Sequence, residues 1–399
     1  MKSPQSERVV RSLLRLEGQG TFVASHREPA LGLFLEVEGV GRCNLPLRRE
    51  QIEALLDRAT PSPFGYRDQT LTDPAVRSSV ELPGSAIELT PRGWAPRFER
   101  GLEEVCEALG FPPEAKVTPV LSKLVLYQEG QFFARHRDTE RDANMAASLV
   151  VVLPSVHEGG ELVVSHAGEE VLCETSSGSQ KHLSFVGFYA DCVHEVRPVT
   201  SGTRVALTYA LHVEAAGTAS PSFVVDEEFP DLCQSVEAFF DKAEWMVVLL
   251  DHHYSTKSLT WARLKNSDRA RADALRRVAR TLNAKCFLAL ADVRETYEAP
   301  EGDQPGELPP GGYGPLVDLS VTLDHWLDEA GEPCAGTDLE GDIECTVSTI
   351  DSHTRAAYHQ WHEPWTGNEG GTADRWYHQT ALVVVPGGDL LQEMLDPPL

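Results

Sequence analysis

Five short runs rich in β-forming residues, all between positions 121 and 213, constrain the fold of this chain more than any other feature. They are LSKLVLY (121–127), ASLVVVL (147–153), ELVVSH (161–166), HLSFVGFYA (182–190) and RVALTYALHV (204–213). Turn-forming or charged segments separate the runs, as expected for short strands joined by loops. Strands at this spacing predict an antiparallel barrel or jelly roll.

The segments on either side of these runs have a different character. Helices are predicted at 47–59 and 97–109, where apolar residues recur at helical spacing and prolines follow. The small residues of 214–225 predict a linker. Beyond them, a helix at 268–282 capped by Ser267 is expected. Further strands are expected at 286–291, 316–323, 343–350 and 377–385.

The predicted fold class is therefore α+β, mainly β, and 399 residues are enough for two domains. We expect residues 1–119 to form a helical and strand-containing flank of the first domain, and residues 120–213 to form its jelly-roll core. Residues 226–399 would form a C-terminal α+β module, joined to the core by the linker 214–225.

Composition limits the function and the compartment. A formal charge of −26, from 35 basic and 61 acidic residues, makes nucleic acid an unlikely partner, because phosphate binding needs clustered Lys and Arg. The eight cysteines form no CxxC pair, so neither a zinc ribbon nor a disulfide scaffold is indicated. No apolar run in the N-terminal region is long enough for a signal peptide or membrane helix, so a cytoplasmic protein is expected.

A set of metal-ligating residue types lies within the β-rich region. His136 and Asp138 form a His-x-Asp pair, His194 follows in a later strand-like run, and Arg204 comes ten residues after it. Two imidazoles and one carboxylate on one face of an octahedron bind non-haem Fe(II) and leave positions open for a co-substrate and dioxygen. An arginine on a rigid strand can hold the far carboxylate of a dicarboxylate co-substrate through two parallel hydrogen bonds.

The order and spacing of these residues resemble those of a known family. Tyr127, Gly130, Phe133, His136 and Asp138, then Gly159-Gly160-Glu161-Leu162, then His194-Glu195-Val196 and Gly202-x-Arg204, are similar to the prolyl 4-hydroxylase-like branch of the Fe(II)/2-oxoglutarate dioxygenases. The resemblance covers about residues 120–213 and implies a double-stranded β-helix core.

The resemblance also implies a cofactor set and a role for each residue. His136, Asp138 and His194 would bind Fe(II), Arg204 and Tyr127 would bind 2-oxoglutarate, and dioxygen would be the oxidant, with ascorbate a candidate reductant. Proline-hydroxylating relatives often carry an aromatic residue where this chain has Val152, which weakens proline as the target. Ser148, on the same strand face as Val152, is a candidate substitute hydrogen-bond donor to 2-oxoglutarate. The retained Asp138 carboxylate favours hydroxylation or demethylation over halogenation.

Three functions remain open from the sequence. The first is an oxygenase that hydroxylates a protein or peptide side chain, with succinate and carbon dioxide as co-products. The second is a hydroxylase of an amino acid or other small molecule, which a cavity capped by residues 64–82 would favour. The third is a non-catalytic 2-oxoglutarate or oxygen sensor whose C-terminal module binds a partner.

Overall fold

The computed structural model divides into two compact units, which are described separately. The jelly-roll unit is Gln19–Ala216, and the split unit combines Met1–Gly18 with Gly217–Leu399. The residues that the structure describes are 3–16, 18–66, 69–89, 91–138, 144–214, 228–299, 313–334, 339–350, 357–363 and 371–388.

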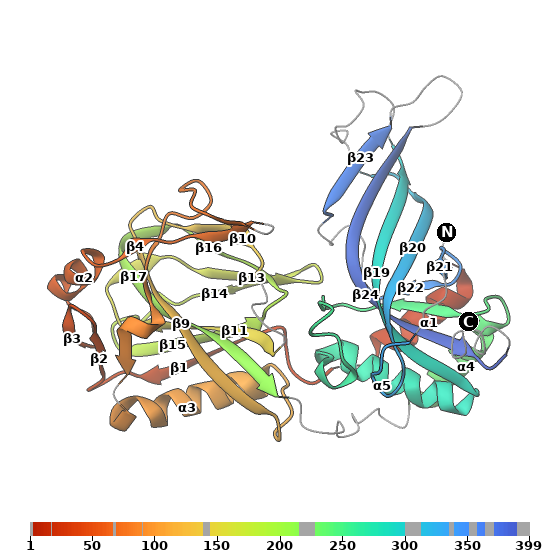
Figure 1. Ribbon diagram of the computed structural model, residues 1–399, viewed down its shortest axis with the longest axis horizontal. Helices are drawn as coiled ribbons and strands as arrows, with labels where there is room; N and C mark the ends of the chain where they lie inside the picture. The colour runs from red at the N-terminus through yellow and green to blue at the C-terminus, as the bar shows by residue number, and fades with distance from the viewer. Residues whose placement is uncertain are drawn as a thin grey trace. The chain divides into compact units, whose positions relative to one another are not determined.

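Two antiparallel sheets face each other in the jelly-roll unit (Figure 1). The larger sheet runs in the order β1 (Val23–Pro29), β15 (His182–Tyr189), β11 (Met145–Leu153), β17 (Val199–Glu214), β9 (Lys116–Gln128), β7 (Val80–Pro83) and β4 (Thr60–Pro61), with β12 (His157–Gly159) on β17. The smaller sheet runs β10 (Phe133–His136), β16 (Val193–Val196), β13 (Leu162–His166) and β14 (Glu169–Cys173). This pair of sheets is the jelly-roll core of a double-stranded β-helix, so the predicted fold class is confirmed.

The remaining elements of this unit lie around the two sheets. They are β2 (Phe34–Val37), β3 (Gly41–Asn44), α2 (Arg49–Leu56), the hairpin of β5 (Phe64–Tyr66) and β6 (Gln69–Leu71), η1 (Gly84–Ala86), β8 (Ile87–Leu89) and α3 (Pro91–Ala108). Helix α3 packs on β1 and β15, along the face of the larger sheet that points away from the smaller one. Because strand side chains alternate, the opposite face is left to line a space between the sheets.

The split unit is a mixed, mostly antiparallel sheet with helices packed on it. The sheet order is β21 (Glu340–Gly341), β20 (Leu316–Leu327), β19 (Ala284–Glu298), β24 (Thr372–Pro386), β18 (Met246–Leu249) and β22 (Thr346–Ser348), with β23 (His359–Glu363) on β24 and a parallel β18–β22 pair. The helices are α1 (Pro4–Leu14), α4 (Phe229–Phe240), η2 (Trp261–Arg263) and α5 (Asn266–Thr281). Among the described residues, no helix has both the length and the apolar character needed to cross a bilayer.

Several boundaries differ from the sequence-based expectation. Helix α1 does not belong to the flank assigned as 1–119: it joins the split unit, because Val9 and Leu13 are fully buried in the core formed with α4 and α5. The helix at 268–282 begins at Asn266 with Lys265 as N-cap, so the prediction of Ser267 as the cap is wrong. In the run 343–350, only β22 is a strand. The predicted linker lies almost entirely outside the described residues.

Candidate metal centre

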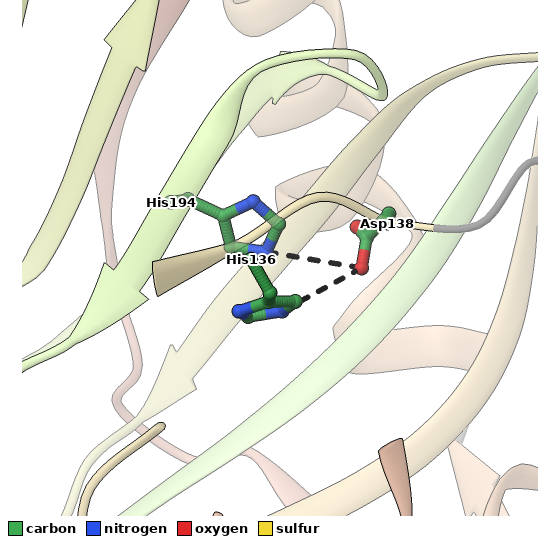
Figure 2. Close-up of side chains that lie close together, drawn as sticks. All are labelled: His136, Asp138 and His194. Atoms are coloured by element: carbon green, nitrogen blue, oxygen red, sulfur yellow. Dashed lines mark ion pairs between the residues drawn. The ribbon is translucent and has the colours of Figure 1, made fainter. Parts of the chain in front are cut away.

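Three side chains with metal-ligating atoms meet at the edge of the smaller sheet (Figure 2). His136 ends β10, Asp138 follows two residues later, and His194 lies on β16 directly opposite His136 in the antiparallel register. An Asp138 carboxylate oxygen lies 4.0 Å from Nε2 of His136 and 3.8 Å from Nε2 of His194. The strand pairing therefore brings together residues that are far apart in the sequence.

Hydrogen bonds to the backbone orient both imidazoles. Nδ1 of His136 lies 2.8 Å from the Ala134 carbonyl oxygen, and Nδ1 of His194 lies 3.2 Å from that of Cys192. When Nδ1 donates its hydrogen to a carbonyl, Nε2 keeps the lone pair that a metal requires. Burial, and secondarily the neighbouring His194, lower the pKa of His136 to about 3, which keeps this imidazole neutral and able to bind a cation.

Aromatic rings hold the two imidazoles in place. The Phe133 ring stacks on His136 with centroids 3.5 Å apart, and the Phe188 ring lies 4.5 Å from that of His194. The Arg77 guanidinium lies over the Phe133 ring, with its Cζ 4.4 Å from the ring centroid. Sequence reasoning placed Phe133 in the motif but assigned no role to Arg77 or Phe188.

Ser148 contacts the carboxylate of the metal centre. Its hydroxyl donates a short hydrogen bond to Asp138. The larger sheet places Ser148 opposite Ala210 of β17 and Phe188 of β15, on the face that points toward the smaller sheet. The expected role of Ser148 as a donor to 2-oxoglutarate stays a prediction, and its contact in this structure is instead with a metal-ligating residue.

A cavity of about 200 Å³ extends from the metal-ligating residues between the two sheets. Arg204 on β17 and Tyr127 on β9 lie directly opposite each other in the register, and both line the cavity. Arg204 is 1% exposed, yet its Nε and Nη2 have no hydrogen-bond partner among the described residues. Burial lowers the pKa of this guanidinium, while Tyr127 and Glu161 act to raise it.

Gly160 makes room for Arg204. A Cβ atom at this glycine would lie 2.8 Å from Cδ of Arg204 and 3.0 Å from a methyl group of Val199, and its φ of +68° is one that L-residues rarely adopt. The Gly159-Gly160 pair belongs to the sequence motif, but its contact with Arg204 was not predicted. A pair of glycines before a strand is ordinarily a turn signal, and only the tertiary contact reveals its second role.

Part of the segment 64–82 borders the cavity. Phe64, Gly65 and Arg77 are among the lining residues. Two backbone hydrogen bonds also join the segment to the residues before His136. The Ala134 amide donates to the Val76 carbonyl, and the Ser78 amide donates to the Phe132 carbonyl. It is therefore joined to the strand that carries the first metal-ligating histidine.

Comparison with known proteins identifies the jelly-roll core. Residues 122–212 match the family model described as the 2OG-Fe(II) oxygenase superfamily. The match includes His136, Asp138, His194 and Arg204. No curated protein matches the chain.

Solved oxygenase structures resemble the chain over about half of its length. A prolyl hydroxylase from Trichoplax adhaerens, in complex with a hypoxia inducible factor peptide fragment, is 14% identical with a TM-score of 0.31, over 52% of this chain and 88% of that one. A Pseudomonas putida prolyl-4-hydroxylase is 20% identical with a TM-score of 0.28, and the match covers 52% of this chain and 100% of that one. An oxygenase of the 2OG-Fe(II) family from Burkholderia pseudomallei is 16% identical with a TM-score of 0.28, and the match covers 52% of this chain and 90% of that one.

The residues present suit the cofactors of this dioxygenase family. Two imidazoles and a carboxylate form the donor set that non-haem Fe(II) takes. The buried Arg204 presents unpaired N–H groups to the cavity, which is what a carboxylate ligand needs. When bound, Fe(II), 2-oxoglutarate and dioxygen supply the oxidising chemistry, and the protein supplies orientation and a shielded cavity.

Proposed function

We propose that this protein hydroxylates a C–H bond on a protein or peptide side chain, with conversion of 2-oxoglutarate and dioxygen to succinate and carbon dioxide. The observation that carries the proposal is the pairing of two features in one cavity. The metal-ligating trio lies at its edge, and within it lies the buried Arg204 guanidinium, whose Nε and Nη2 have no hydrogen-bond partner in the described part of the chain.

Each residue of the site has a proposed role. His136, Asp138 and His194 would hold Fe(II) through two Nε2 atoms and a carboxylate oxygen. Arg204 would receive the carboxylate of 2-oxoglutarate farthest from the metal, with the Tyr127 hydroxyl as a second donor. The rings of Phe133 and Phe188 pack against the two imidazoles and would limit the rotation of both.

A second substrate class has support from the segment 64–82. Phe64, Gly65 and Arg77 border the cavity, whose volume is about 200 Å³. A free amino acid or another small metabolite would fit a cavity bordered in this way, and so would one side chain of an extended peptide.

The test is succinate release from 2-oxoglutarate with Fe(II) and ascorbate, with and without host-cell extract separated into protein and small-molecule pools. We expect the protein pool to stimulate release, His136→Ala to abolish it, and Arg204→Gln to raise the KM for 2-oxoglutarate at least about tenfold. Arg197→Gln is the matched control, because Arg197 is 44% exposed and does not line the cavity.

Three other outcomes of the succinate-release assay would contradict hydroxylation of a protein or peptide. Stimulation only by the small-molecule pool would favour the metabolite hydroxylase. Binding of metal and 2-oxoglutarate without turnover in any pool would favour a sensor. If neither metal nor 2-oxoglutarate binds the wild-type protein, the proposed function is wrong.

A further inference from the structure

One face of the split-unit sheet exposes a group of aromatic side chains. In the halves of β19 and β24 farthest from α5, residues with odd numbers, such as Val293, Ala373 and Tyr377, are buried. The even-numbered residues therefore point to the opposite face, which also receives alternate residues of β20 and β23. Its aromatic members, here called the aromatic face, are His359, Trp361, Trp376 and His378 by strand register, and Tyr358, whose ring stacks on that of His378.

The rings of the aromatic face are held against one another while remaining accessible. Tyr358 stacks on His378 with centroids 4.4 Å apart and planes 16° apart, and His359 packs at 4.9 Å on Trp376. Tyr358 is 53% exposed and Trp361 46% exposed. Large aromatic side chains gathered on a solvent-exposed surface are typical of an interaction site, because isolated domains rarely leave such patches in water.

Carboxylates surround these rings. Asp292, Glu298, Asp318, Glu363 and Asp374 lie on the same face by strand register. Arg294 is the one lysine or arginine on the described part of this face, and it pairs with Asp318 at 3.1 Å. The face therefore carries an excess of negative charge that its own residues do not neutralise.

The aromatic and acidic groups are interleaved rather than segregated. Trp361 lies directly opposite Asp374, and one position along the same side of β23 comes Glu363. Asp292 accepts a hydrogen bond from the Tyr358 hydroxyl at 3.1 Å and lies 3.7 Å from Nδ1 of His378. A cation placed on the Trp361 ring would thus have a carboxylate within reach, and the faces of aromatic rings, Trp above all, attract Lys and Arg side chains.

We propose that the aromatic face binds a basic, arginine- or lysine-rich peptide segment of a partner protein. The charge of the face excludes nucleic acid, whose phosphates it would repel. The same charge favours a cationic peptide over a neutral sugar, since five carboxylates give a sugar no electrostatic benefit. Backbone pairing of the long strands provides a rigid platform, so little ordering of the protein is required on binding.

The experiment is a calorimetric titration of the full chain in 150 mM salt with a decapeptide of alternating arginine and glycine. A decapeptide of alternating glutamate and glycine serves as the opposite-charge probe. We expect a micromolar dissociation constant for the arginine peptide and no detectable binding of the glutamate peptide. Trp361→Ala should weaken binding at least about tenfold, while Trp361→Phe, which keeps an aromatic ring, should stay within about threefold.

A matched pair of charge reversals separates this site from the bulk charge of the protein. Glu363→Lys alters the aromatic face, whereas Asp231→Lys makes the same change in net charge on α4, at a side chain that is 66% exposed. We expect about a tenfold loss only in Glu363→Lys. Equal losses in both variants, no binding of the arginine peptide, or Trp361-dependent binding of cellohexaose in its place would each overturn the proposal. The titration does not depend on turnover, so His136→Ala should bind the peptide as the wild-type protein does.

Discussion

At the scale of single residues, Ser148 connects the larger sheet to the metal centre. Its hydroxyl donates to Asp138, and partners of this kind orient a ligand and raise metal affinity. We predict that Ser148→Ala weakens Co(II) binding about 10- to 100-fold, measured by titration of the metal-free protein, and that Ser148→Thr restores most of it. An unchanged Co(II) affinity with a raised KM for 2-oxoglutarate would instead support Ser148 as a co-substrate ligand.

Gly160 leaves room for the side chain of Arg204, the proposed ligand of 2-oxoglutarate. A methyl group at this position would press on Cδ of Arg204, so we predict that Gly160→Ala raises the dissociation constant for 2-oxoglutarate at least about tenfold while Co(II) affinity changes less than twofold. Gly130→Ala is the control, because Gly130 has a similar φ of +78° but no atom within 4 Å of its added Cβ. Equal effects in both variants would assign the loss to backbone strain alone.

His157 makes the stability of the jelly-roll unit depend on pH. It is 3% exposed, and burial together with the nearby Arg204 lowers its pKa to about 4. Because the folded state resists protonation below the ordinary value of about 6.5, the contribution of His157 to stability is complete above that pH. It then falls by up to about 1.4 kcal/mol per pH unit between pH 6.5 and 4.

The measurement is urea unfolding of metal-free protein at pH 7 and pH 5. We predict that the loss of unfolding free energy between these two values is about 1–2 kcal/mol smaller in His157→Gln than in the wild-type protein. A loss of the same size in both proteins would show that His157 is not the group that titrates.

At the scale of elements, the packing of α3 on the larger sheet depends on Gly187, a glycine in β15. A Cβ at Gly187 would lie 2.3 Å from Cγ1 of Val105, so a larger residue there would push the helix off the strand. We predict that Gly187→Ala lowers the free energy of unfolding by about 1–3 kcal/mol in chemical denaturation. The double variant Gly187→Ala/Val105→Ala should recover part of this loss, and no recovery would contradict the packing explanation.

The elements that sequence periodicity predicted correctly are those whose pattern is local. The runs 121–127, 147–153 and 182–190 all became strands of the larger sheet, because alternation and β-branched residues act within one segment. The cap of α5 was mispredicted for a tertiary reason: Asp268, in the first turn, accepts hydrogen bonds from the backbone amides of Asp251 and His252. No local rule identifies that partner segment.

At the scale of the whole molecule, the chain begins in one unit, forms the other, and returns to the first. Leu13 of α1 is fully buried in the split-unit core. We predict that Leu13→Ala costs about 2–5 kcal/mol in the unfolding of the split unit. Tryptophan fluorescence reports this transition, since six of the seven tryptophans follow residue 217.

Metal binding provides the control for that experiment. Because the metal-ligating residues all belong to the jelly-roll unit, Leu13→Ala should leave the Co(II) dissociation constant within about twofold of the wild-type value. A large loss of Co(II) affinity would show that the two units do not fold independently of each other.

The sequence alone predicted the jelly-roll class and selected His136, Asp138, His194 and Arg204 as candidate site residues, because strand periodicity and motif order are properties of the chain itself. The roles of these residues toward Fe(II) and 2-oxoglutarate stay predictions. Tertiary structure decided the rest. It placed Gly160 against Arg204, bonded Ser148 to Asp138 and assigned α1 to the split unit. It also gathered five aromatic side chains on one sheet face. These features arise from contacts between residues distant in sequence, whose geometry depends on how whole sheets pair and pack.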